Sequence, residues 1–217
     1  MAHPYTTEFV EFCRNNIHIQ GTTSVYHSLP ICIIDCVYSL RTKYKSVTVP
    51  IVHRYADTYL NGNVMDTDDN LSLFLEHMNH CGLQYFADKV VCNHQKLGGI
   101  PKEEICYKIA TYLKCLNINT LAEFRDYSHP ELLEIVLNGI KGFGDAGVNY
   151  LFMLAGDTSR CKPDVHIHRS IQDACGNDVT NDECQVIFTE AVAEMQTEHP
   201  NLTVRDLDFA VWSHYRV

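Results

Sequence analysis

The feature that most constrains this chain is a helical repeat of apolar residues along much of its length. Residues 180–198 show it best, because their apolar side chains recur three and four positions apart, at Cys184, Ile187, Phe188, Ala191, Val192 and Met195. That spacing places them on one face of a helix. Thr180 can cap the start of this helix, and Pro200 stops it.

The same spacing predicts helices throughout the chain. Residues 101–115 form a clear one, with Pro101 in the first turn followed by two glutamates that suit the helix dipole. The remaining predicted helices are 7–15, 46–60, 71–80, 82–92, 120–126, 130–137, 145–155, 165–175 and 203–214. Residues 47–52 are β-branched and could form a strand, but no convincing partner strand follows. We therefore expect an all-α fold.

Composition supports a globular protein in a reducing compartment. Hydrophobic residues make up 46% and charged residues 20% of the 217 positions. No apolar run reaches the length of a membrane span, and the N-terminus shows no signal-peptide pattern, so we expect an intracellular protein without a membrane partner. The ten cysteines fit buried thiols, as at Cys32 and Cys36, and disulfides are the second interpretation.

The charge distribution leaves a nucleic-acid partner open. The net charge of −10 argues mildly against one. Residues 36–54, however, hold four cations and no acid: Arg41, Lys43, Lys45 and Arg54. Ordinary solvated surface charge is the alternative interpretation of this cluster.

Closely spaced glycines separate two predicted helices in the run Gly139-Ile140-Lys141-Gly142-Phe143-Gly144. They allow a tight turn and a close approach to another surface. The helix that begins near Asp145 would present unpaired backbone N–H groups beside the turn, and these can bind a phosphate. The alternative is a plain glycine turn between packed helices.

The second notable segment follows the apolar helix 145–155. This helix ends at Gly156, and Pro163 then sets the approach to Asp164, which stands at the start of the next helix. A helix N-cap is a very common use of an aspartate in that position.

The order of hairpin, apolar helix, Gly/Pro loop and aspartate resembles the helix–hairpin–helix Gly/Pro-Asp superfamily of DNA glycosylases, which includes endonuclease III. The family hairpin Leu-Pro-Gly-Val-Gly corresponds to Ile140-Lys141-Gly142-Phe143-Gly144. The family loop Val-Asp-Thr-His-Ile-x-Arg corresponds to Pro163-Asp164-Val165-His166-Ile167-His168-Arg169. The match covers residues 139–169, with a fainter one at 37–41.

The resemblance implies a two-lobed helical fold with a central cleft. The whole chain, 1–217, would form one such unit. Residues 46–150 would make the central lobe, with the hairpin at 139–145. Residues 1–45 and 157–217 would make the second lobe.

The resemblance also implies an activity. Asp164 would be the catalytic carboxylate that stabilises positive charge on the sugar and orients water to hydrolyse the N-glycosidic bond of a damaged or modified base. The partner would be double-stranded DNA with a flipped base, bound by a monomer. Residues 140–144 would grip DNA, and His166 and Arg169 would support the active site.

Departures from the family pattern narrow the prediction. Ala146 stands where bifunctional members carry a lysine, so no Schiff base can form there and we expect a monofunctional enzyme. Lys141 replaces the hairpin proline and adds either a phosphate contact or a neutral surface change. Only Cys175 and Cys184 lie in the C-terminal part, so we expect no iron–sulfur cluster and no other cofactor.

Some candidate residues have two interpretations. A zinc site built from Cys161, His166, His168 and Cys175 matches no standard spacing, so no metal is expected. Ser39 and Arg41 align with the residue that fills the gap left by a flipped base, although Arg41 could simply be an exposed helix-end arginine. Tyr38, Tyr44, Asn149 and Met153 are candidates for the base pocket or for core.

Two other functions remain open. A non-catalytic helix–hairpin–helix DNA-binding module would keep the hairpin without turnover, and Ala146 is compatible with it. A helical scaffold for a protein partner is compatible with the acidic net charge.

Overall fold

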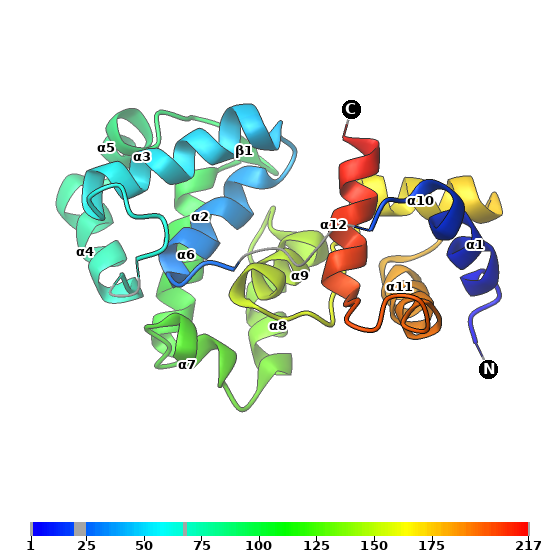
Figure 1. Ribbon diagram of the computed structural model, residues 1–217. Coiled ribbons are helices and arrows are strands. Elements are labelled where there is room, and N and C mark those ends of the chain that lie inside the picture. Colours follow the sequence, from blue (N-terminus) through cyan, green and yellow to red (C-terminus); the bar gives the residue numbers. More distant parts are fainter. Residues whose placement is uncertain (1, 20–24, 67–68, 217) are drawn as a thin grey trace. The chain divides into compact units, whose positions relative to one another are not determined.

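A computed structural model describes residues 2–19, 25–66 and 69–216, and most of them are helical (Figure 1). The all-α prediction is confirmed at this level, with one two-stranded sheet among the described residues. The chain divides into two compact units. Unit 1 consists of residues 1–24 and 157–217, and unit 2 of residues 25–156.

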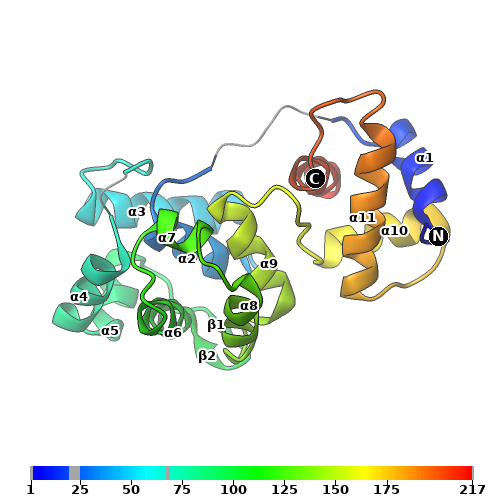
Figure 2. The same cartoon turned by 90° about the horizontal axis from the view of Figure 1, so that it is seen from below.

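Unit 2 is built around one helix, α2 (Leu29–Ser39), whose residues are all buried. It packs against α3 (Val49–Tyr59), α6 (Lys102–Cys115) and α9 (Gly144–Ala155) (Figures 1 and 2). The other elements of unit 2 are η1 (Tyr44–Thr48), α4 (Leu71–Cys81), α5 (Leu83–Tyr85), η2 (Phe86–Val90), β1 (Lys96–Leu97), β2 (Ile100–Pro101), α7 (Leu121–Arg125) and α8 (Pro130–Asn138).

Helix α2 was absent from the helices predicted by periodicity, and its burial explains why. A helix buried on every side has no polar face, so its sequence carries no alternation to detect. Residues close in sequence nevertheless mark the start of α2, because the Oγ of Ser28 accepts the N–H of Ile31 and Pro30 occupies the first turn. Because α2 packs within unit 2, the predicted assignment of residues 25–45 to the other lobe is corrected.

One segment differs in detail from its predicted form. The predicted helix 46–60 begins as the π-helix η1, and α3 follows with Pro50 in its first turn, so the strand alternative for 47–52 is wrong. The Gly98-Gly99 pair forms the turn of the β1–β2 hairpin, which lies beside α6 and the α8–α9 turn (Figure 2).

Unit 1 contains α1 (Thr6–Asn16), α10 (Val165–Cys175), α11 (Asn181–Met195) and α12 (Val204–Tyr215). Helix α1 packs on α10 and α11, and α12 packs on the same pair. Helices α11 and α12 both start with capping boxes, at Thr180 with Glu183 and at Thr203 with Asp206. The unit is therefore assembled from two distant stretches of chain around its own core.

Two further observations concern the state of the cysteine thiols and the hydrophobicity of the helices. All ten cysteine thiols are free, and six of them are buried. None of the described helices combines the length and the apolar character needed to cross a bilayer.

Candidate functional site

The glycine turn between α8 and α9 lies in unit 2 and is anchored by its two apolar residues. Ile140 and Phe143 are each 3% exposed. The N–H of Phe143 donates to the carbonyl of Ile140 (3.0 Å), which closes the turn. Lys141, Gly142 and Gly144 are exposed between and beside these anchors. The turn therefore presents its backbone and one cation to solvent at the start of α9.

Gly142 is required by both its conformation and its surroundings. Its φ is +91°, and a Cβ there would lie 2.5 Å from the carbonyl oxygen of Leu97. Gly144 also has a positive φ, +64°, but a Cβ there would meet nothing within 4 Å. The β1–β2 hairpin thus packs directly on the backbone of the turn at Gly142 and leaves Gly144 open.

Ala146, the residue predicted to stand in place of a glycosylase lysine, is half-buried in the first turn of α9. A methyl side chain offers no amine for a covalent sugar adduct. Asp145 beside it is exposed and suits the positive end of the helix.

Asp164 lies in unit 1 and caps α10. Its Oδ1 accepts the N–H of His166 (2.9 Å) and, at longer range, that of Ile167 (3.4 Å). Its Oδ2 lies 3.9 Å from Nζ of Lys162, and the side chain is 21% exposed. One carboxylate oxygen therefore serves the helix, while the other faces a lysine and solvent.

The loop that leads to Asp164 is held by two helices of unit 1. Gln185 on α11 accepts the N–H of Cys161 (3.0 Å) and donates to the carbonyl of Ser159 (2.8 Å). Asp208 on α12 accepts the N–H of Lys162 through Oδ1 (2.7 Å). Asp164 is thus the end of a loop whose backbone is fixed by side chains from elsewhere in the unit.

Asp208 is a residue that the sequence did not indicate. It is buried on α12, and burial raises its pKa to about 7, with the nearby Asp164 adding to the rise and the N–H of Lys162 opposing it. A single signal was present in the sequence: Asp208 falls among the apolar residues of its helix, where an aspartate is unusual.

The two predicted supporting residues differ in exposure. His166 is half-buried, and its backbone N–H belongs to the cap of α10. Arg169 is exposed and lies 3.7 Å from Asp173, with its guanidinium 5.1 Å from the ring of Tyr215. The charge of Arg169 is therefore directed toward partners on α10 and α12.

The structure separates the two candidates for the gap-filling residue. Ser39 is 9% exposed, and its hydroxyl donates to the carbonyl of Cys36 within α2 (2.8 Å). Arg41 is exposed and has a φ of +57°, which is uncommon for an arginine. Of the two, only Arg41 offers its side chain to solvent.

Tyr44, one of the candidate pocket residues, belongs to a cluster on a buried carboxylate. Asp35 on α2 accepts hydrogen bonds from the hydroxyls of Tyr44 (2.7 Å), Tyr26 (2.8 Å) and Tyr150 (3.2 Å). These bonds tie η1, the start of unit 2 and α9 to the central helix. Sequence reasoning missed Asp35 as the centre of this cluster, because its partners are spread over the chain.

The other candidate pocket residues are core or near-core. Tyr38 and Met153 are buried, and Asn149 is half-buried. Among the described residues, no group of three or more His, Cys, Asp or Glu side chains is placed to hold a metal ion. His168, from the zinc alternative, lies 3.0 Å from the Oδ1 of Asn181 through its Nε2.

Comparison with known proteins places the chain in one family. A family described as a domain of unknown function (DUF8548) matches residues 7–216, and the chain belongs to it. No curated protein matches the chain. No solved structure matches it either.

Proposed function

We propose that this protein is a monofunctional DNA glycosylase that acts on a damaged or modified base. The observation that carries the proposal is a pair of local structures. An exposed glycine turn opens helix α9, and the Asp164 carboxylate keeps Oδ2 away from its own helix cap. The sequence motifs around both resemble those of helix–hairpin–helix glycosylases.

In this proposal, unit 2 supplies the grip on DNA. The backbone N–H groups beside Gly142 and Gly144 donate to a phosphodiester, and the dipole of α9 favours the same negative charge. The exposed ammonium of Lys141 adds a charge contact. Backbone donors of this kind make DNA binding compatible with an acidic protein.

Unit 1 supplies the chemistry. Once the base has left the stack, the bond between the sugar C1′ and the base nitrogen lengthens, and positive charge builds on the sugar. The Asp164 carboxylate stabilises that charge and accepts a proton from the attacking water. The water oxygen joins C1′ as the bond to the base nitrogen breaks, the base nitrogen takes a proton from solvent, and Asp164 then returns its own proton to solvent. Ala146 provides no amine, so the DNA strand is left uncut.

A second candidate is a non-catalytic DNA-binding module, and one observation favours it. Oδ1 of Asp164 caps α10, so the presence of the aspartate is explained without any catalysis. The two candidates share double-stranded DNA as the partner and differ in turnover.

The deciding experiment is release of free base from a panel of lesion-bearing duplexes, read by mass spectrometry. We expect release by the natural protein and a loss of at least about a hundredfold in Asp164→Asn. Asparagine caps helices as well as aspartate, so the variant should fold and bind DNA normally. Asp182→Asn, which makes the same change at an exposed carboxylate of α11, serves as the control and should keep full activity.

Each outcome separates the candidates. Full activity in Asp164→Asn removes the catalytic assignment. Duplex binding without release from any lesion in the panel favours the non-catalytic module. Absence of salt-dependent duplex binding contradicts both.

A further inference from the structure

The cations of unit 2 fall into two groups according to whether the protein itself uses them. Five are engaged internally. Arg54 donates to the carbonyl of Val91, and Arg125 donates to that of Ala155. Lys108 pairs with Glu104 (2.7 Å). Lys114 donates to Ser72 and Asn119, and Lys102 is buried on backbone carbonyls.

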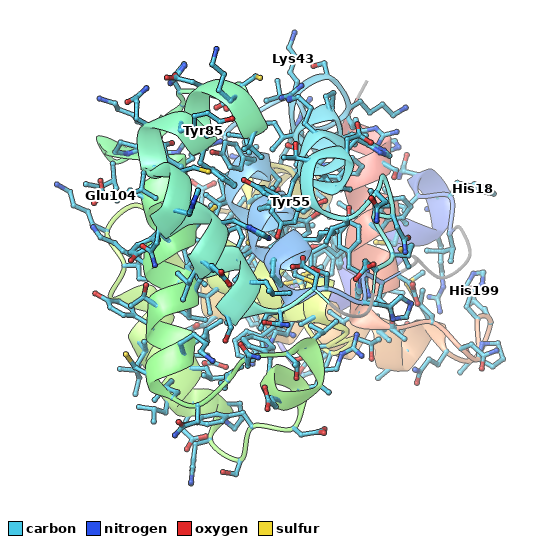
Figure 3. All side chains as sticks on the ribbon, turned by 90° about the vertical axis from the view of Figure 1, so that its left-hand side faces the viewer. His18, Lys43, Tyr55, Tyr85, Glu104 and His199 are labelled. Carbon is cyan, nitrogen blue, oxygen red and sulfur yellow. The ribbon has the colours of Figure 1, made fainter. Side chains whose placement is uncertain are left out.

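The second group consists of exposed cations, which we call the basic face: Arg41, Lys43, Lys45, Lys89, Lys96 and Lys141. Within the described residues, none of the six has a carboxylate within 4 Å or a side-chain hydrogen bond. Figure 3 shows Lys43 extending from the ribbon at one margin of the molecule, apart from Glu104. The six come from three segments only: 41–45, 89–96 and 141.

Packing joins these three segments. Nζ of the buried Lys102 donates to the carbonyl of Leu40 (2.8 Å) and to Oε1 of Gln95 (3.3 Å), so it links the residues next to Arg41 and Lys96. Helix α3 packs on both η1 and η2, whose segments carry Lys45 and Lys89.

The third segment is joined through the glycine turn. A Cβ on Gly98 would lie 3.3 Å from the Cα of Gly142, so the β1–β2 turn rests on the turn that carries Lys141. The three segments that carry the basic face are therefore joined to one another through packing of their neighbouring residues.

The three segments of the basic face contain no Asp or Glu. The exposed carboxylates nearest to them in sequence are Asp88 and Asp145. Asp88 lies 3.2 Å from His94. Glu103 interacts with Lys96 but is itself buried. The surface thus keeps a net positive charge on a protein whose overall charge is −10.

We infer that the basic face extends the DNA grip of the glycine turn by binding several phosphates of a duplex backbone, with Lys89 and Lys96 as contacts outside the hairpin. This inference rests on the proposed function for the choice of DNA. Single-strand binding uses exposed aromatic side chains as stacking platforms. The three segments offer no exposed Phe, Tyr or Trp side chain, because Tyr44 is half-buried and bonded to Asp35.

The test is duplex affinity as a function of salt, measured by fluorescence anisotropy with an undamaged 20-base-pair DNA. Each lost phosphate contact lowers the slope of log K against log salt by about 0.9. Lys89→Ala with Lys96→Ala should therefore lower the slope by about 2 and weaken binding by roughly fiftyfold near 0.1 M salt. Lys108→Ala removes a cation that is already paired with Glu104, and it should change neither quantity.

The outcomes separate this inference from the proposed function. An unchanged slope in the double variant overturns the basic face, even if lesion bases are released. A lower slope in a protein that releases no base supports the basic face and contradicts the glycosylase. Tighter binding to single-stranded RNA, or to vesicles of anionic lipid, than to duplex DNA overturns the assignment of the partner.

Discussion

At the scale of single residues, two buried or half-buried aspartates lie near each other for different reasons. Asp164 keeps the cap of α10, and its carboxylate is partly exposed. Asp208 is buried below the loop and holds the N–H of Lys162. Burial removes the Asp208 carboxylate from water, and its few hydrogen-bond donors do not compensate for the lost hydration, so its pKa is raised. With a pKa of about 7, Asp208 is about half protonated near pH 7.

This difference predicts a pH dependence of stability. The pKa of Asp208 is about 7 in the folded protein and near its ordinary value of 3.8 when unfolded. Between those values the folded state holds a proton that the unfolded state releases, so stability falls as pH rises and levels off above 7. The contribution reaches at most about 4 kcal/mol.

Asp208→Asn should remove this dependence, because the amide oxygen still accepts the N–H of Lys162 and carries no charge. Urea unfolding at pH 5, 6, 7 and 8 should show the variant gaining stability relative to the natural protein as pH rises. Asp182→Asn is the control at an exposed position and should show no such trend. A constant difference between Asp208→Asn and the natural protein across this range would contradict the assigned cause.

At the scale of elements, the turn between α8 and α9 shows how two glycines with similar φ can have different roles. Gly142 is packed beneath the carbonyl of Leu97, while Gly144 faces open space. The first glycine serves the contact between the turn and the β1–β2 hairpin. The second keeps the backbone exposed at the start of α9, where an anion would bind.

An alanine at each position should separate these roles. Gly144→Ala should lower the free energy of unfolding by about 1 kcal/mol, which is the cost of an alanine in the left-handed conformation. Gly142→Ala has the same conformational cost and also places a Cβ against the backbone carbonyl of Leu97, so we expect the free energy of unfolding to fall by about 3 kcal/mol or more. Chemical unfolding of both variants measures the difference. Equal losses would show that the hairpin moves away from the turn at little cost.

At the scale of the whole molecule, charge is unevenly divided. Unit 1 carries six Lys and Arg against thirteen Asp and Glu, and unit 2 carries eleven against fourteen. The acidic character that argues against DNA therefore comes mainly from unit 1. Unit 2 is a single stretch of chain with its own core, while unit 1 needs both ends of the chain.

Residues 25–156 expressed alone should therefore fold and bind duplex DNA with the salt slope of the full chain, yet release no base, because they lack Asp164. Circular dichroism and cooperative unfolding report the fold, and anisotropy reports binding. The same fragment with Lys89→Ala and Lys96→Ala is the control for specific loss of binding. If the fragment folds but does not bind duplex DNA, the nucleic-acid contacts must lie elsewhere in the chain.

The sequence by itself determined where most helices lie, because caps and apolar spacing act over a few residues. The predicted helix 165–175 coincides with α10, with Asp164 at its N-cap. The glycine turn at residues 139–144 was also predicted from residues that are close together in sequence. Only the tertiary structure revealed the central helix α2, since a fully buried helix has no polar face to mark its period.

The tertiary structure also decided which distant residues meet. Asp208 lies under a loop 46 positions away at Lys162, Leu97 covers Gly142, and Lys102 joins Leu40 to Gln95. These contacts arise when segments distant in sequence pack together within each unit, and no short stretch of sequence contains both partners. For the same reason, only the folded chain shows that the three segments of the basic face pack against one another.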